Sequence, residues 1–270
     1  MKSILSILLV GCSITSFAQG WVPAGARSMS MGNASVTFQE VWAYHNNPGA
    51  LGELKKFSAG VSYENRFLLK ELQSQALAVA VPLKVGVISA GAHLYGSNRY
   101  RSYKAGVGYS LRLADKFSAG VQLNYQGIRL PDAYGSRSNM SAEVGLFARF
   151  TENWTMGFSV FNLNRAKLSE YGDDRFMTFM RLGTAYQFSK KFLVAIEAEK
   201  DLEYALRFKS GVEYKVIDEF VLRAGVQTAP LELSFGFGYH PKMVQIDFGT
   251  SYHQILGWSP HFSVQFELNK

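Results

Sequence analysis

The side chains best suited to catalysis are five histidines, and their spacing argues against an enzyme. They are His45, His93, His240, His253 and His261. Nucleophilic catalysis needs a nucleophile and a base within reach of each other. None of the five lies in an H-x-S-N-G spacing, which would indicate a phospholipase, and His93 falls on the apolar phase of its segment, where an interfacial position is expected. We therefore expect no enzymatic activity.

Metal-binding and cofactor-binding patterns are equally weak. Cys12 is the only cysteine, and it falls in an N-terminal signal, so the mature chain offers no disulfide and no thiolate zinc site. Asp173 and Asp174, near Glu170, could bind calcium, but the EF-hand pattern is absent and a solvated charged loop is the better interpretation. No metal site and no cofactor are predicted.

Ten charged residues share the polar phase of alternating segments, which is a stronger pattern. A soluble β-sandwich also alternates, but it exposes its polar face to water. Here that face is rich in Gly, Ser and Ala and carries both signs of charge, which favours pairing across a narrow interior. The ten residues are Lys104, Arg112, Glu143, Arg149, Glu197, Arg207, Lys209, Glu213, Arg223 and Asp247.

The elements that carry these charges are strands. Apolar and small or polar residues alternate strictly in 57–63, 117–125 and 262–268, which predicts a sheet with one apolar and one polar face. Most segments are longer than the ~5–6 residues usual in soluble sheets, and that length, tilted, crosses a bilayer. The fourteen predicted strands are 56–64, 72–81, 84–95, 99–113, 116–127, 138–150, 153–162, 177–188, 191–200, 204–216, 219–228, 231–240, 242–253 and 260–268.

The connections support the same fold. Six are tight, for example Pro82-Leu83 and Ala114-Asp115, and they alternate with mostly longer ones such as 128–137 and 163–176. Short turns on one side and longer loops on the other are typical of an up-and-down outer-membrane barrel. The predicted fold is all-β, a 14-stranded antiparallel transmembrane barrel with both termini on the periplasmic side. Aromatic residues near strand ends fit the girdles of such a barrel.

The first residues and the net charge indicate where in the cell the protein is located and which partners it meets. Lys2, the apolar run 4–10 and Ser16-Phe17-Ala18 form a secretory signal over residues 1–18. A lipobox ending at Cys12 is the alternative processing site. The charge is +7, with no run of five basic residues, so nucleic acid is not an expected partner. Outer-membrane lipid and lipopolysaccharide are expected partners, and the cell outer membrane is the expected location.

Residues 19–55 break the alternation, and 56–270 form the predicted barrel. The early segment is neither poor in apolar residues nor highly charged, as a disordered leader would be. Its apolar side chains, including Met29, Met31 and Trp42, need burial. We therefore predict a plug inside the barrel.

Two stretches of this segment resemble a known family. They are 26–36, ARSMSMGNASV, and 47–51, NPGAL. Together they look like the N-terminal hatch of the FadL-like barrels, which include long-chain fatty acid transporters and the PorV/PorQ proteins of type IX secretion in Bacteroidota. The match departs at Ser30, Asn33 and Gly49. The resemblance implies a plug threaded through the lumen, with the motif residues Arg27, Met29, Met31, Gly32, Asn46, Asn47, Pro48 and Gly49.

Two functions follow from this resemblance. One is a PorV/PorQ-like protein-interaction component that binds type IX secretion proteins. The alternative is a plugged channel that takes up hydrophobic small molecules such as long-chain fatty acids. Mixed lumen charges and short loops favour the first. Asn47-Pro48-Gly49 has strong turn chemistry, and we expect it to anchor the plug, with Asn46 and Asn47 bonded to backbone or to inward residues such as Ser58 and Ser62.

Overall fold

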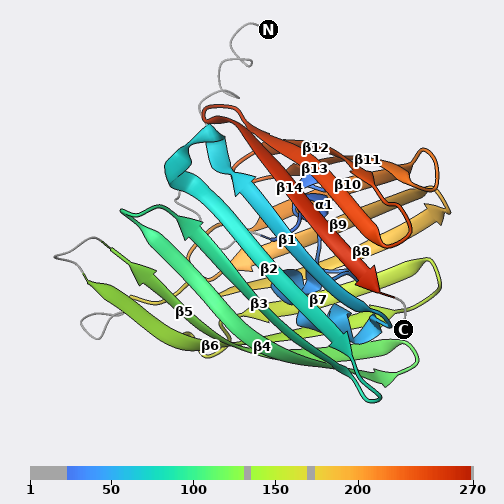
Figure 1. Cartoon of the computed structure of the whole chain (residues 1–270), viewed down its shortest axis with the longest axis horizontal. Helices are drawn as coiled ribbons and strands as arrows, with labels where there is room; N and C mark the ends of the chain where they lie inside the picture. Colours follow the sequence, from blue (N-terminus) through green and yellow to red (C-terminus); the bar gives the residue numbers. More distant parts are fainter. Residues whose placement is uncertain (1–22, 131–134, 169–173, 269–270) are drawn as a thin grey trace, which may run out of the picture.

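The computed structural model of the chain describes residues 23–130, 135–168 and 174–268. Fourteen antiparallel strands form a closed barrel in which each strand pairs with its neighbours in sequence and β1 pairs with β14 (Figure 1). The predicted fold is confirmed. The strands are β1 Phe57–Asn65, β2 Gln73–Pro82, β3 Val87–Gly96, β4 Arg101–Ala114, β5 Phe117–Arg129, β6 Ser136–Arg149, β7 Trp154–Phe161, β8 Phe179–Ser189, β9 Phe192–Asp201, β10 Arg207–Lys215, β11 Phe220–Gln227, β12 Glu232–Tyr239, β13 Val244–His253 and β14 Gly257–Leu268.

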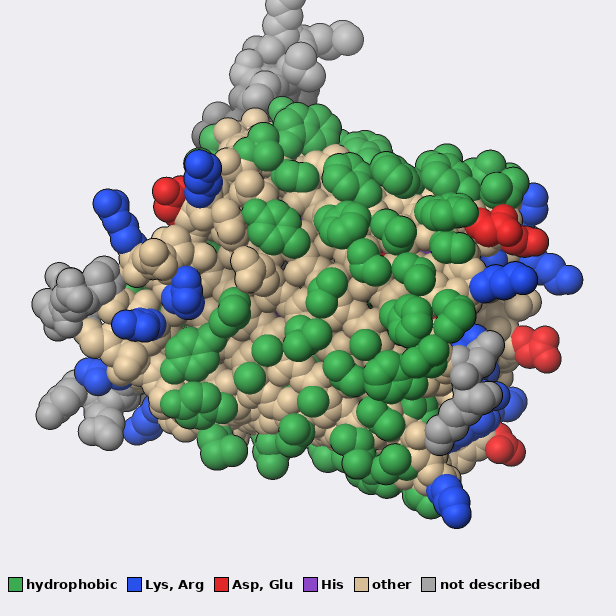
Figure 2. All heavy atoms as spheres, in the orientation of Figure 1, with side chains coloured by type: hydrophobic (Ala, Val, Ile, Leu, Met, Phe, Trp, Pro, Cys, Tyr) green, Lys and Arg blue, Asp and Glu red, His purple; other side chains and the backbone are tan. Residues whose placement is uncertain are grey.

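The alternation decides which side chains face the lumen. In β5, Val121 and Leu123 are more than half exposed, whereas Gln122 and Asn124, which alternate with them, are buried. Apolar side chains therefore cover the outer wall, and charged ones gather at its two ends (Figure 2). An apolar belt of this kind faces lipid, and the buried polar row faces the interior. No helix among the described residues is long and apolar enough to cross a membrane.

One stretch of the wall is not closed by strand pairing. β6 and β7 pair only between 144–149 and 155–160, so the outer half of β6, which is paired with β5 on one side, has no strand on its β7 side. The loop after β7 takes that place. Leu163 N donates to Ala142 O over 2.8 Å, and the Asn164 side chain bonds both Ala142 N and Met140 O over 3.0 Å. A loop that lies along a strand in this way satisfies its backbone groups.

The N-terminal segment, residues 23–56, lies inside the barrel and carries three short helices: α1 Ala26–Ser30, α2 Ala43–Asn46 and η1 Pro48–Glu53. Two further helical turns, η2 Arg66–Leu68 and η3 Lys70–Leu72, connect β1 to β2. Trp42, Tyr44 and Leu51 are fully buried against small inward residues such as Ala78 and Ala80. This segment thus supplies large apolar side chains at a level of the lumen where β2 supplies only alanines.

Strand boundaries differ from the predictions by a few residues. The last strand begins at Gly257 and not at 260, because Pro260 pairs with Thr250 as part of a regular ladder. The predicted signal 1–18, with Cys12, and the start of the predicted plug at 19 lie outside the described residues.

Candidate functional site

Asn47-Pro48-Gly49 fastens the N-terminal segment to the wall. Asn47 is fully buried, and its Nδ2 donates to Val36 O over 2.7 Å and to Leu146 O of β6 over 3.0 Å. Its Oδ1 accepts from Gly49 N over 3.0 Å, which caps η1. One amide therefore joins two parts of the segment and one strand, and satisfies the backbone groups that the turn leaves open.

The next two carbonyls of this turn also bond the wall. Pro48 O accepts from Ser110 Oγ over 2.7 Å, and Gly49 O accepts from Ser118 Oγ over 2.8 Å. Gly49 itself has no room for a side chain, because a Cβ there would lie 2.5 Å from the backbone of Gly145. The turn is thus pressed against β4, β5 and β6, where only small inward residues allow the approach.

Asn46 holds the segment together and does not reach the wall with its side chain. Its Nδ2 donates to Ser28 Oγ over 2.9 Å, and its Oδ1 accepts from Ala24 N over 3.2 Å. Of the two kinds of partner expected for Asn46 and Asn47, the structure shows backbone groups, such as Ala24 O and Val36 O, and not the inward serines. The turn lies against β4, β5 and β6, and Ser58 Oγ in β1 donates to Lys56 O.

Arg27 begins a chain of charges that runs from the segment into the wall. Its guanidinium donates to both oxygens of Glu213, over 2.8 and 2.9 Å, and to Glu40 over 3.0 Å. Arg223 donates to Glu213 over 2.7 Å and to Asp247 over 2.6 Å. Burial raises the pKa of Glu40, against the opposing attraction of Arg27. These alternating charges fix the register of α1 against β10, β11 and β13.

A second chain of charges is the most deeply buried. Arg181 Nε donates to Glu199 over 2.8 Å, and Lys209 Nζ donates to Glu197 over 2.9 Å and to Glu199 over 2.7 Å. Arg207 closes the group with a 2.8 Å bond to Glu199. We call these five residues the β8–β10 charge cluster: Arg181, Glu197, Glu199, Arg207 and Lys209.

Glu197 ties that cluster to the N-terminal segment. Its Oε2 accepts from Ser35 N over 2.8 Å and from Val36 N over 2.9 Å. The carboxylate is 1% exposed, so both amides depend on it for a partner. The wall therefore contributes the acceptor that a turn of the segment needs.

The remaining predicted charges also lie on the inner wall. Lys104 Nζ donates to Glu143 over 2.9 Å in a buried pair. Arg112 and Arg149 approach Glu53 of η1, at 3.8 and 3.1 Å, near the ends of β4 and β6 that face the short turns. All ten predicted charges thus take part in an ion pair, with a nearby strand or with the N-terminal segment.

Met29, Met31 and Gly32 lie where α1 meets the wall. Met31 is buried with Ala34 and Phe38 of the segment against small residues of β8 and β9. Gly32 has φ +62°, and a Cβ there would overlap the backbone of Val226. Met29 lines a small polar pocket on the outer side of α1 with Asn33, Glu64, Arg66, Glu232, Ser251 and His261.

Sequence reasoning missed several charges of the lumen and misplaced one histidine. Arg181 and Glu199 share the inward phase of β8 and β9, and the same alternation could have found them. His93 is buried inside the barrel, with Nε2 2.7 Å from Ser74 Oγ, so its assignment to the apolar phase is wrong. Its small neighbours Ala90, Gly91 and Ala92 leave the phase of β3 unmarked.

No group of three or more metal-ligating side chains occurs in the described ranges. Of the loop considered for calcium, Glu170 and Asp173 lie outside the residues that the structure describes. His45, at the end of α2, is 3.1 Å from Leu77 O, and burial lowers its pKa well below the ordinary value. A neutral, enclosed imidazole of this kind serves packing and hydrogen bonding.

Comparison with known proteins relies on structure, since neither a protein-family model nor a curated protein matches the sequence. The monoaromatic hydrocarbon channel CymD is 14% identical, with a TM-score of 0.68 over 94% of this chain and 100% of that one. The toluene transporter TbuX of Ralstonia pickettii is 15% identical, with a TM-score of 0.68 over 93% and 100%. A FadL homologue of Pseudomonas aeruginosa is 14% identical, with a TM-score of 0.65 over 92% and 98%.

The chain has the fold of the FadL-like outer-membrane barrels. This agrees with the predicted fold and with the predicted location in the outer membrane. The names of these three proteins describe two transport proteins and a homologue, and none describes an enzyme, in line with the expectation from the histidines.

This FadL-like barrel also has an aromatic pair on its inner wall that sequence reasoning missed. Phe161, the last residue of β7, stacks on Phe179, the first of β8, with ring centroids 4.8 Å apart and planes within 8°. Lys104 Nζ lies 4.8 Å from the centre of the first ring, and Arg181 lies 4.6 Å from the second. The pair borders the end of the β6–β7 ladder, where strand pairing stops.

We expect Asn47→Ala, combined with Pro48→Ala, to make this FadL-like barrel leak. The change removes both hydrogen bonds from Nδ2 and the cap of η1, and leaves buried carbonyls without donors at about 1–3 kcal/mol each. Swelling of proteoliposomes in small sugars measures the leak. Asn153→Ala, in an exposed turn, is the matched control. Background permeability in a correctly folded double variant would show that the turn merely connects elements.

Proposed function

We propose that this chain is a plugged outer-membrane channel for hydrophobic small molecules. The observation that carries the proposal is the stacked pair Phe161 and Phe179, which faces inward beside the stretch of β6 that has no strand on its β7 side. The FadL-like fold supports it, because several barrels of this fold are named for toluene or monoaromatic hydrocarbons. These proteins resemble the chain in fold, and the proposal adds that the chain also shares their class of substrate.

The surroundings of the pair suit an apolar, ring-containing ligand. Met177, from the loop before β8, packs against the rings, and Phe176 of the same loop is buried. On the outer side of the same break, Met140 and Leu163 are more than half exposed in the lipid-facing wall. Apolar side chains thus lie on both sides of a wall segment held by a loop. Stacking on an aromatic face contributes about 0.5–1.5 kcal/mol beyond the burial of area.

The same geometry implies that transport requires movement. Below the aromatic pair, the lumen is filled by the N-terminal segment and by ion pairs such as Arg181–Glu199. A hydrophobic molecule cannot cross this region unless the segment shifts. In the proposed mechanism, the ligand occupies the aromatic pair first, and displacement of the segment from the wall opens the path to the periplasm.

Uptake of toluene and of a long-chain fatty acid, measured with labelled compounds in cells that depend on this barrel, tests the proposal. We expect Phe161→Ala with Phe179→Ala to slow uptake of the better substrate by up to about tenfold, since the variants lose the stacking energy of the ring pair. Phe188→Ala, at an exposed outer-wall position, is the control. Uptake no faster than through cells without the barrel would overturn the proposal.

A second candidate function is a PorV/PorQ-like interaction component of type IX secretion. The observation that favours it is the lumen, in which ionic groups and the N-terminal segment leave the described interior packed with polar contacts. A barrel that never opens could serve as a membrane-held docking surface. Purification of the tagged protein from native outer membranes, together with secretion of type IX cargo in a deletion strain, distinguishes the two. Normal secretion combined with lost hydrophobic uptake would exclude this second function.

A further inference from the structure

Two arginines oppose each other on the outer wall at the rim with the longer loops. Arg101 of β4 and Arg129 of β5 are direct cross-strand partners. Both alternate in phase with exposed apolar residues such as Val107 and Leu123. Their side chains therefore leave the strands on the lipid-facing side of the wall. Like charges directly opposite each other in a ladder destabilise it. A bound anion would remove this cost.

Their own side chains leave most of their donors available. Among the described residues, Arg129 has no hydrogen bond or ion pair, and Arg101 makes one 3.3 Å hydrogen bond to Asn98 Oδ1. A guanidinium has five donors in a planar fork that fits the oxygens of a phosphate. The two side chains therefore offer many more donors than the described residues use.

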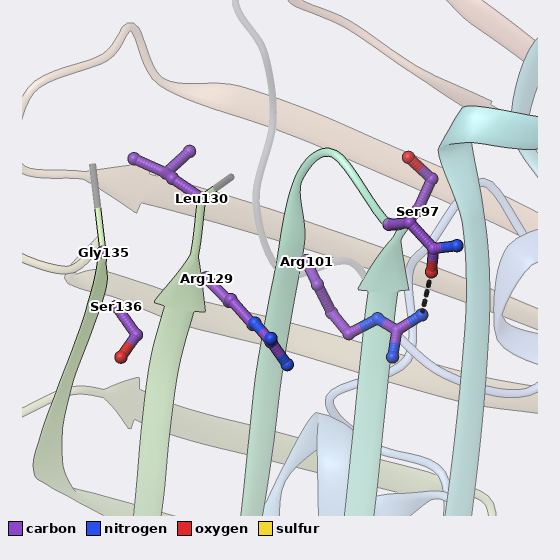
Figure 3. A pocket seen from close by; sticks show the side chains of 7 residues that line it. Ser97, Arg101, Arg129, Leu130, Gly135 and Ser136 are labelled. Atoms are coloured by element: carbon purple, nitrogen blue, oxygen red, sulfur yellow. Dashed lines mark hydrogen bonds between the residues drawn. The ribbon is translucent and has the colours of Figure 1, made fainter. Parts of the chain in front are cut away.

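A cavity of about 500 Å³ lies between the β3–β4 hairpin and the β5–β6 hairpin. Figure 3 shows both arginine side chains beside it, with serines on either flank. The hydroxyls of Ser97 and Ser136 add neutral donors and acceptors, which sugar and phosphate groups both use. Its lining residues are Ser97, Asn98, Arg101, Arg129, Leu130, Gly135 and Ser136.

The level of this cavity relative to the membrane follows from the next row of side chains. Tyr103, two residues from Arg101, and Tyr125, four residues from Arg129, lie closer to the middle of β4 and β5, with ring centroids 6.0 Å apart on the same outer face. Tyr125 Oη also donates to Ser138 Oγ over 2.7 Å. Tyrosines in such a row mark the membrane interface. The arginines, one row beyond Tyr103 and two rows beyond Tyr125, therefore lie at the level of the lipid headgroups.

We propose that this rim cavity binds a phosphate group of lipopolysaccharide in the outer leaflet. The charge, the fork geometry of two arginines, the flanking hydroxyls and the position just beyond the tyrosine row all match a phosphorylated sugar headgroup. Such a lipid would seat beside the β3–β6 wall and neutralise the arginine pair. The inference does not depend on what passes through the barrel.

Binding of defined lipids to the full-length barrel tests the proposal. The barrel is placed in nanodiscs free of lipopolysaccharide, and native mass spectrometry then follows the binding of diphosphorylated lipid A, of dephosphorylated lipid A and of inorganic phosphate. We expect Arg101→Ala with Arg129→Ala to weaken binding of diphosphorylated lipid A by about tenfold or more, since bonds to charged groups are lost. Arg137→Ala is the matched control, because Arg137 pairs with Ile128 on the opposite face of the sheet.

Each arm has a defined meaning. The proposal is supported if diphosphorylated lipid A binds tightly, the dephosphorylated form binds weakly, and only the double variant loses the difference. Equal loss in the control variant would indicate a diffuse basic rim and would overturn it. Inorganic phosphate that binds as tightly as lipid A would also overturn it, since the site would then serve a free anion.

Discussion

Replacing Glu197 with leucine will destabilise the barrel by about 3–5 kcal/mol, the usual cost of removing one partner from a buried ion pair. Lys209 loses its 2.9 Å bond, Arg181 loses a carboxylate 3.7 Å away, and two backbone amides lose their acceptor. The formal charge of the cluster rises from +1, three cations against two carboxylates, to +2 in a region where Glu197 is 1% exposed. Few other single side chains of this lumen have as many buried partners.

Urea unfolding of the barrel in lipid vesicles, followed by tryptophan fluorescence, measures this loss. Glu152→Leu makes the same chemical change in an exposed turn, and we expect it to alter the free energy of unfolding by less than about 0.5 kcal/mol. Glu197→Gln should fall between the two, because the amide oxygen can still accept from Ser35 and Val36. A loss below 1 kcal/mol for Glu197→Leu would mean that water reaches the cluster and replaces the carboxylate.

The strands of this barrel can be predicted from the sequence because the two-residue period of a strand is a property of its backbone. Side chains of a strand alternate between faces, and a wall between lipid and a polar lumen turns that alternation into a pattern of residue types. In β5 the pattern runs unbroken from Phe117 to Tyr125, and the predicted strand lies within two residues of the observed one. In β3, where Ala90, Gly91 and Ala92 are equally small, the phase was unmarked and His93 was placed on the wrong face.

Contacts across the lumen were beyond sequence reasoning for a different reason. Alternation says that Glu213 faces inward, but it does not say which inward group lies opposite. Its partner Arg27 is 186 residues away and sits in a segment without strand periodicity. Likewise, the stacking of Phe161 on Phe179 depends on the loop between β7 and β8, whose path no local pattern specifies. The elements of the site were predictable, and their pairing was not.

Gly145→Val will open the lumen of a correctly folded barrel. Gly145 faces inward from β6, and a Cβ there would lie 2.5 Å from Gly49 N and 2.9 Å from Pro48 Cδ, besides overlapping the Asn47 side chain. The wall is a hydrogen-bonded ladder on both sides of this residue, whereas the turn is held mainly by side chains. The added methyl groups should therefore displace the turn and leave the strand in place.

The size of the effect follows from the cost of overpacking, about 1–3 kcal/mol, since each ~1.4 kcal/mol changes the ratio of seated to displaced segment tenfold. We expect solute flux in proteoliposomes to rise by about tenfold or more. Ala105→Val, an outward and exposed position on β4, is the control for added volume. An unchanged heat-modifiable gel shift verifies that the barrel has folded.

The same variant separates the two candidate functions. If the segment must leave the wall for a hydrophobic molecule to pass, Gly145→Val should also speed uptake of toluene, because part of the work of displacement is already done. A barrel that acts only as a docking surface would leak small sugars without any gain in hydrophobic uptake over the membrane background. Tight, sugar-impermeable vesicles with a folded Gly145→Val barrel would show instead that the N-terminal segment does not seal the lumen at this turn.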